Sequence, residues 1–330
     1  MKNKTIILLI VLPLLLIVLS VFHLTIGELN FSFSTFYNSI FNYNSTNSTE
    51  LIIHEFRIPR LLIAMIAGSG LAVSGMLMQT LFNNPLAGPY VLGINTGSSL
   101  FVACSFMTGI PFLTHDFSII TSALLGAFIF GLIIISFSSF VRSHISLLLI
   151  GLMLGSFTSS IISILQTNSS SEELKSFTLW TMGSLQTVSF DQLPLILLVF
   201  IVGLFLSLFL IKPLNTLVLG PQASRLLGIN LKIFRLACIG ITALLTGLVT
   251  AFCGPIAFVG LAVPNSTRLL FKTQSHGILL IGNSLIGACF LVCSDVLIEL
   301  FEPYFHLPIN VFTSIIGAPI VIYILIKRLK

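Results

Sequence analysis

The feature that most constrains this chain is the stretch 61–82, which contains no charged side chain. At about 1.5 Å of rise per residue, a helix of that length would cross a hydrocarbon core about 30 Å thick. Small residues recur along it and would let neighbouring helices approach closely where lipid offers no hydrophobic drive. They are Ala64, Ala67, Gly68, Gly70, Ala72, Ser74 and Gly75. The stretch therefore predicts a membrane-spanning helix packed centrally among other helices.

The next segment, 83–89, reads Asn-Asn-Pro-Leu-Ala-Gly-Pro. Two prolines and a glycine cannot continue the helix, and irregular backbone at membrane depth must be sheltered by protein or water. We expect the chain to turn here and start back near Tyr90. From the pattern alone, an ordinary small-residue helix followed by a loop fits equally well.

Composition extends the membrane interpretation to the whole chain. Of the 330 residues, 56% are hydrophobic and 8% are charged, whereas soluble domains carry about 25% charged residues. Ten spans of about 20 residues would use about 200 positions. The chain is therefore expected to be an all-α polytopic membrane protein, with about ten transmembrane helices in a single domain over 1–330.

The apolar runs and the segments between them predict a path through the membrane. The predicted spans are 5–22, 61–82, 91–109, 118–141, 145–165, 193–211, 236–253, 258–270, 276–296 and 311–326. Polar segments at 28–56 and 166–191 are expected outside, with a short outer loop at Pro111 and Asp116 and an inner turn at 142–144. The run 258–270 is short, so it is either partly re-entrant or extends back through Gly254.

Basic residues predict the orientation. Along this path twelve of them fall inside, and only Arg57, Arg60 and Lys175 fall outside. This is the asymmetry of the positive-inside rule, so both termini are expected to be cytoplasmic. The first apolar run has the basic start of a signal peptide, but no small-x-small cleavage site follows it, which favours an uncleaved helix.

The sequence lacks the motifs of several classes of function. We find no Walker A pattern, nucleophile elbow or His-Glu-x-x-His, so the chain is not expected to be an enzyme, and ATP would have to bind to a partner. The five cysteines lie in apolar segments without C-x-x-C spacing, which indicates packing residues rather than a metal site. The net charge of +5 is scattered, which argues against a nucleic-acid partner.

The largest cytoplasmic connection, 212–235, is the best candidate for contact with such a partner. Its central residues are Gly220, Pro221, Ala223, Ser224, Arg225, Leu226, Leu227 and Gly228. Gly220 and Pro221 break the chain, and the residues that follow can form a short helix that ends at Gly228. Two leucines beside one charge at the water boundary need a partner surface. A short interfacial helix lying on lipid is the alternative.

Two blocks of residues at fixed offsets carry a family resemblance. The first block contains Arg57-Ile58-Pro59-Arg60, Gly68, Gly75, Gln79, Asn84 and Pro85, and the second contains Gly254, Pro255, Gly260, Pro264, Asp295, Pro308, Gly317 and Pro319. Together they resemble the signature of the FecCD-type permeases, the membrane subunits of type II ABC importers for iron-siderophore complexes, haem and vitamin B12. The resemblance covers essentially the whole chain.

The resemblance implies a permease in a bacterial cytoplasmic membrane that works by ATP-driven alternating access. It implies a second permease subunit, equal or different, two ATP-binding subunits that hold ATP and magnesium, and an extracytoplasmic solute-binding protein whose tethering, for instance as a lipoprotein, is left open. The segment 223–228 is similar to the family's coupling helices. A ferric siderophore is the expected substrate, and haem and cobalamin follow. An ion-coupled secondary transporter is the rival, but it would need several acids near the bilayer middle.

In the family, rim arginines pair with acidic residues of the binding protein. Arg57 and Arg60 match that role by position. Arginine suits such docking because its pairs with carboxylates are bidentate. Anchoring of the central helix at the membrane interface is their alternative role. Glu299 stands where the family usually has arginine and reverses the charge at a third docking position.

Three further positions are notable. Asn265 replaces the usual histidine after Pro264, and Asn310 replaces a glycine. Asp295 is the most deeply placed ionisable residue, and an acid within a span is a functional candidate by default. Because Asp295 lies near the end of its helix, a structural role, either capping or pairing with a basic residue, is favoured.

Overall fold

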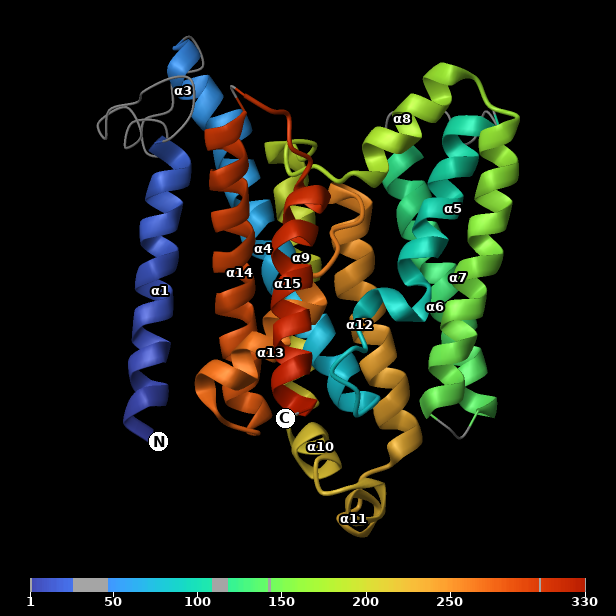
Figure 1. The fold of residues 1–330 in the computed structure, drawn as a ribbon, viewed down its shortest axis with the longest axis vertical. Helices are drawn as coiled ribbons and strands as arrows, with labels where there is room; N and C mark the ends of the chain where they lie inside the picture. Colours follow the sequence, from blue (N-terminus) through green and yellow to red (C-terminus); the bar gives the residue numbers. More distant parts are fainter. Residues whose placement is uncertain (1, 26–46, 109–117, 142–143, 303, 330) are drawn as a thin grey trace.

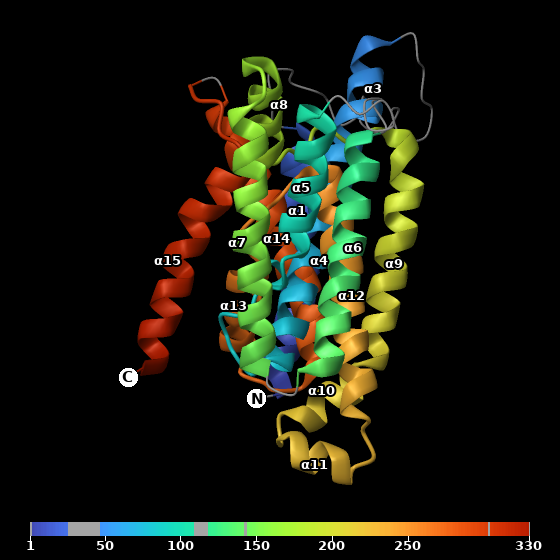
Figure 2. The same ribbon diagram turned by 90° about the vertical axis from the view of Figure 1, so that its right-hand side faces the viewer.

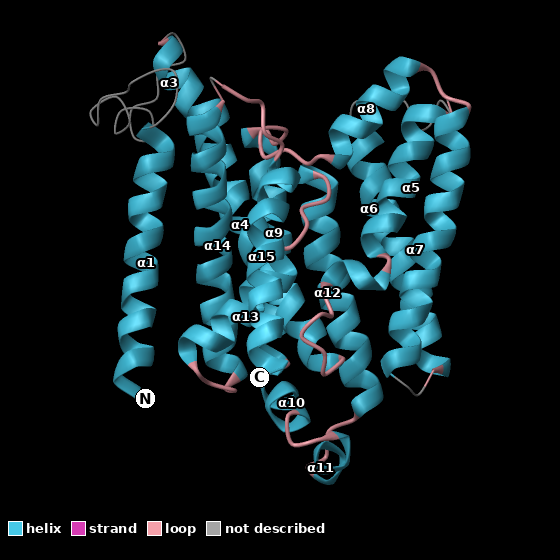
Figure 3. Cartoon of the chain, in the orientation of Figure 1, coloured by secondary structure: helices cyan, strands magenta, loops and turns pink. Residues whose placement is uncertain are grey.

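The computed structural model describes residues 2–25, 47–108, 118–141, 144–302 and 304–329, and these ranges contain helices and loops but no strand (Figure 3). The helices are α1 Lys2–Thr25, α3 Ser48–Ile52, the π-helix η1 Ile53–Arg57, α4 Ile58–Leu81, the 3-10 helix η2 Pro89–Leu92, α5 Ile94–Met107, α6 Ser118–Phe140, α7 His144–Thr167, α8 Ser171–Thr181, the 3-10 helix η4 Phe190–Gln192, α9 Leu193–Phe209, α10 Ile211–Leu217, α11 Pro221–Leu226, α12 Leu231–Cys253, α13 Val259–Phe271, α14 His276–Phe301 and α15 Ile309–Leu329.

Each predicted span coincides with one of these helices. Within the described ranges, seven helical segments are long and apolar enough to cross a membrane, and α5 and α15 contribute shorter apolar helices. The helix α13 has only 13 residues. The all-α fold and its multiple apolar helices are therefore confirmed, whereas the number of ten crossings stays a prediction.

The described ends of the chain lie at the same end of the molecule as α10 and α11, while α3 and α8 lie at the opposite end (Figures 1 and 2). We refer to these as the α11 end and the α8 end. Termini that share an end agree with the predicted topology, and its cytoplasmic orientation stays a prediction. The predicted features at 28–46, the loop with Pro111 and Asp116, and the first two residues of the turn 142–144 lie outside the described residues.

The helix α4 is the centre of the molecule, as its small residues predict. Nearly every residue from Leu61 to Leu81 is buried, in contrast to α1, which exposes most of its length. Two glycine pairs explain the packing. A Cβ atom on Gly68 would overlap the carbonyl of Gly287 in α14, and one on Gly75 would overlap the backbone of Gly260 in α13. Backbone therefore contacts backbone on two sides of α4.

Three boundaries differ from the sequence-based expectation. Helix continues outward from α4 through η1 and α3 into the segment expected to be a polar loop. Pro59 lies in the first turn of α4, directly after the π-helix η1. The outer segment 166–191 contains α8, which starts with a capping box between Ser170 and Glu173. The helix α13 does not extend back through Gly254, whose φ of +71° places it in the left-handed region.

Candidate functional site

A compact group of charged side chains lies near the α8 end, between α1, α4 and α14. Arg60 donates from Nε to Oδ2 of Asp295 at 2.7 Å and from Nη2 to Oδ1 at 2.9 Å. His23 of α1 lies 2.7 Å from Oδ2 through its Nε2. The side chains of Arg60 and Asp295 are only 12% and 4% exposed. Asp295 therefore pairs with a basic residue, which is the contact that the structural role favoured from the sequence requires, and the role itself stays a prediction.

The other two predicted docking residues lie beside this pair. Glu299, one turn after Asp295, places Oε1 3.8 Å from Nη1 of Arg60. Arg57 donates to the carbonyl oxygen of Leu24 at 2.8 Å and so ties the start of α4 to the end of α1. This contact links two helices, and the alternative role of Arg57 as an anchor at the membrane interface stays a prediction. Docking by Arg57, Arg60 and Glu299 stays a prediction.

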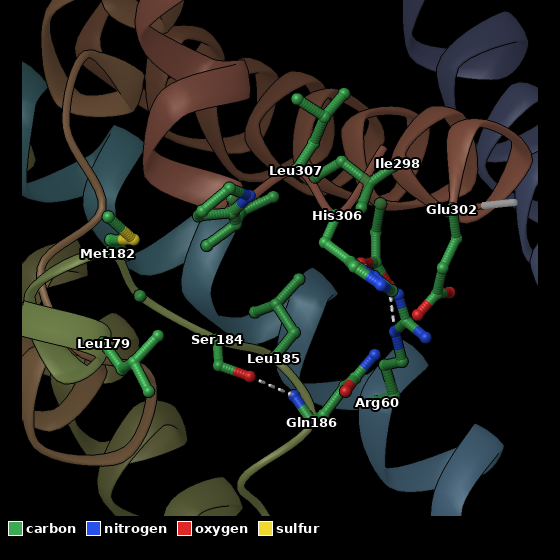
Figure 4. Close-up of a pocket in the computed structure, with 14 residues that line it drawn as sticks. Arg60, Leu179, Met182, Ser184, Leu185, Gln186, Ile298, Glu302, His306 and Leu307 are labelled. Carbon is green, nitrogen blue, oxygen red and sulfur yellow. Dashed lines mark hydrogen bonds and ion pairs between the residues drawn. The ribbon is translucent and has the colours of Figure 1, made fainter. Parts of the chain in front are cut away.

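A cavity of about 410 Å³ opens next to the charged group. Arg60, Glu302 and His306 line one side of it, and Met182 and Leu179 lie on the other (Figure 4). The polar side comes from α4 and the segment after α14, and the apolar side comes from the end of α8. The cavity therefore presents charge on one wall and hydrocarbon on the other.

The loop after α4 is held by side-chain amides. Asn84 accepts a hydrogen bond from the backbone N–H of Leu86 at 2.9 Å, which forms a tight turn around Pro85. Asn265 of α13 donates to the carbonyl oxygens of Pro85 and Leu261, both at 2.9 Å. The amide at 265 thus supplies donors at the position where the family usually has histidine.

The second irregular segment, 254–258, is fixed from two sides. The hydroxyl of Tyr90 donates to the carbonyl oxygen of Ile256 at 2.5 Å, and the Ile256 N–H donates back at 3.0 Å. The side chain of Asn310 accepts from the N–H of Ala257 at 3.0 Å through Oδ1, and its Nδ2 donates to the carbonyl oxygen of Thr181 at 3.4 Å. Asn310 therefore adds contacts that a glycine could not make, and Gly254 and Pro255 are held between α8 and α15.

The remaining family-motif residues lie in α4, α13 and α15 or directly before α15. Gly317 of α15 leaves no room for a Cβ beside the side chain of Phe258. Pro264 and Pro319 lie inside α13 and α15, and Pro308 directly precedes α15. Gln79 accepts a hydrogen bond from Nη1 of Arg268 and donates to the carbonyl oxygen of Leu261 at 3.2 Å.

The predicted coupling segment protrudes at the α11 end. The short helix α11 follows Gly220, and the chain leaves it at Gly228 with a φ of +81°, which confirms the predicted helix stop. Leu226 is 90% exposed and Leu227 is 56% exposed, whereas Ser224 is buried and donates to the Gly220 carbonyl oxygen. The helix thus carries an apolar pair on its outer side and a hydrogen bond that braces its inner side.

Comparison with known proteins matches residues 15–327 to the model of the FecCD transport family. The hemin transport system permease protein of Yersinia pestis is 32% identical over 96% of this chain and 94% of its own length. A vitamin B12 import system permease protein of Escherichia coli is 34% identical over 86% of each chain. A solved structure, described as an inward-facing conformation of a metal-chelate type ABC transporter, superimposes with a TM-score of 0.85 at 29% identity, over 97% of this chain and 98% of that one.

The fold and these relatives define the class: the permease subunit of an ABC importer. The chain belongs to the FecCD transport family. It is a multi-pass protein of the cytoplasmic membrane, and permeases of its family work with an ATPase and a substrate-binding partner.

Sequence reasoning missed His23 and α8. His23 lies in an apolar run, and nothing in its local pattern shows that Asp295, far away along the chain, is its partner. The start of α8 did carry a signal, because Ser170 and Glu173 have the spacing of a capping box.

Proposed function

We propose that this chain forms half of a membrane dimer that imports a metal chelate, with a ferric siderophore as the substrate. Two ATP-binding subunits bind at the α11 end, and a solute-binding protein, tethered as a lipoprotein or free, delivers substrate to the α8 end. In this proposal ATP binding and hydrolysis move the α10–α11 segment, and the pathway at the dimer interface opens alternately to the two sides of the membrane. The chain itself holds no ATP, cofactor or resident metal.

The observation that carries the proposal is the exposed surface of α11. Leu226 projects its whole side chain from a six-residue helix at the tip of the molecule. Burying such a side chain contributes about 1.5–3 kcal/mol, so a protein surface that covers it gains affinity. The adjacent Arg225 adds a charge that can pair with a carboxylate of the partner. These features suit a helix that seats in a cleft of an ATPase.

The substrate class is supported by what the relatives share. Their names specify hemin, vitamin B12 and a metal chelate, and each of these is a metal ion held in an organic ligand. Ferric siderophores have the same chemistry. Haem is the first alternative and cobalamin the second.

Docking of the binding protein is proposed at Arg57, Arg60 and Glu299. Their position at the α8 end, opposite α11, supports this role. Because Asp295 already binds two guanidinium nitrogens of Arg60, docking through Arg60 would require a carboxylate on the partner to share or replace that pair. Glu299 would contact a basic residue of the partner.

The test is uptake of labelled ferric siderophore by iron-limited cells that carry the wild type, a deletion, or the double variant Arg225→Glu with Leu226→Asp. Loss of uptake in the deletion and in the double variant, with the variant present in the membrane, is expected. Leu226→Met keeps an apolar side chain of similar volume and should transport normally, so it serves as the matched control.

Two results would overturn parts of the proposal. Full uptake by the double variant would refute the proposed ATPase contact at α11 and favour an ion-coupled secondary transporter. Unchanged siderophore uptake in the deletion, together with lost haem or cobalamin uptake, would reassign the substrate.

A further inference from the structure

A continuous series of hydrogen bonds at the α11 end joins four helices. It starts at Asn215 on α10, passes through His276 at the start of α14 and Thr80 at the end of α4, and reaches Arg268 on α13. Asn215 is exposed, whereas His276 is only 1% exposed. The series therefore runs from the surface segment next to α11 into the packed interior.

The direction of the first link can be derived from the backbone. The N–H of His276 donates to Oδ1 of Asn215 at 2.8 Å, and a backbone N–H can only donate, so this atom is the amide oxygen. The imidazole Nδ1 lies 2.9 Å from the same oxygen and must therefore be protonated. In a neutral imidazole the other nitrogen, Nε2, is then an acceptor.

The remaining links follow from this tautomer. The Thr80 hydroxyl lies 3.0 Å from Nε2 of His276 and 2.9 Å from the carbonyl oxygen of Met76, and donation to Nε2 satisfies the buried nitrogen. The same hydroxyl oxygen accepts from Nη2 of Arg268 at 3.2 Å, while Nη1 donates to Gln79. Each donor thus has an acceptor from α13 to α10.

The connection suits the transfer of movement because hydrogen bonds depend steeply on distance and angle. The other contacts of α10 are apolar and include the buried side chain of Leu214 and the partly buried Ile211 and Leu217. Apolar contacts are non-directional and permit sliding. The polar series is directional and therefore holds the register of α10 against α4 and α14 more strictly than the apolar contacts do. A polar cavity of about 500 Å³, lined by Gln79, Thr80, Arg268, His276 and the end of α10, leaves room beside it for displacement.

We propose that Asn215, His276 and Thr80 are positioning residues that transfer movement of the α10–α11 segment to α4 and α13. This inference rests on the proposed ATPase contact at α11. The chain from 218 to 220 between the two short helices is only three residues long, so displacement of α11 moves α10. The hydrogen bonds then pull the end of α4, which leads directly into the loop of Asn84 and Pro85.

The test compares paired variants in the complete importer, reconstituted in proteoliposomes with its ATPase and binding protein. Thr80→Val removes the hydroxyl at constant shape, and Thr80→Ser keeps it. Asn215→Leu removes both accepting contacts, and Asn215→Asp keeps an acceptor oxygen. The readout is the number of ATP molecules hydrolysed per substrate molecule imported, which loss of folding alone does not change.

We expect Thr80→Val and Asn215→Leu to raise this ratio by at least about fivefold, the factor implied by loss of even one typical net hydrogen bond, while Thr80→Ser and Asn215→Asp stay within about twofold of the wild type. An unchanged ratio in Asn215→Leu overturns the inference even if Thr80→Val fails to assemble, because Asn215 is exposed and its replacement by leucine opens no cavity in the core. Normal transport by Leu226→Asp would instead refute the ATPase contact itself.

Discussion

The buried group at the α8 end allows one stability prediction to be worked out in detail. Asp295→Asn keeps the shape of the side chain and removes its charge. The carboxylate accepts two hydrogen bonds from Arg60 and is in contact with His23. Removing one partner of a buried ion pair costs about 3–5 kcal/mol, because it leaves an uncompensated charge.

The expected loss lies at the lower end of that range. Glu299 is 3.8 Å from Arg60 and remains as a counter-charge after Asp295 is neutralised. We therefore expect Asp295→Asn to lower the free energy of unfolding by about 3 kcal/mol. The double variant Arg60→Met with Asp295→Leu removes both charges and should be destabilised by less than the single variant. Glu299 then keeps Arg57 as its basic neighbour.

The assay is equilibrium unfolding of the purified permease in mixed detergent micelles titrated with sodium dodecyl sulfate. Trp180 is the only tryptophan of the chain. It lies in α8, where its ring stacks on Phe177, so its fluorescence reports on the α8 end of the molecule. A loss below 1 kcal/mol for Asp295→Asn, or a double variant less stable than the single one, would refute the reasoning.

Two other substitutions can be measured with the same unfolding assay. Gly75→Ala should lower the free energy of unfolding by about 1–3 kcal/mol, because the added methyl overlaps the Gly260 backbone. In the control Gly70→Ala the methyl would meet only side chains at 3.8 Å or more, so this variant should be neutral or slightly stabilising. Equal losses in the two variants would contradict this explanation. Tyr90→Phe should cost about 1–3 kcal/mol, because the N–H and the carbonyl of one buried residue, Ile256, both lose their partner; an unchanged stability would show that water replaces the hydroxyl.

The sequence predicted the helical fold well because its signals are local. Apolar length determines a span, and Gly and Pro mark the breaks at 83–89 and 254–258. The central position of α4 could also be predicted, since small residues have one main use in a membrane helix. Its specific contacts, Gly68 with Gly287 and Gly75 with Gly260, could not, because no pattern within either segment identifies the other.

The candidate sites show the same limit. The helix α11 could be predicted from Gly220, Pro221 and Gly228, because these residues lie close together in the sequence. The partners of Asp295 and His276 come from distant segments, and a polar residue in an apolar run carries no sign of what it faces. The family resemblance located Asp295 and Gln79 as motif positions, but their contacts depend on tertiary packing.

The glycine contacts also determine how force can travel through this protein. At Gly68 and Gly75 backbone lies against backbone, so no compressible side chain separates α4 from α14 and α13 at these two points. We therefore expect the three helices to tilt together as one lever. The lever is long: 24 residues of α4 span about 36 Å at about 1.5 Å per residue. A tilt of about 5° then shifts one tip by about 3 Å relative to the other. A small pull at Thr80 would reach Arg60 without any chain of side-chain rearrangements between them.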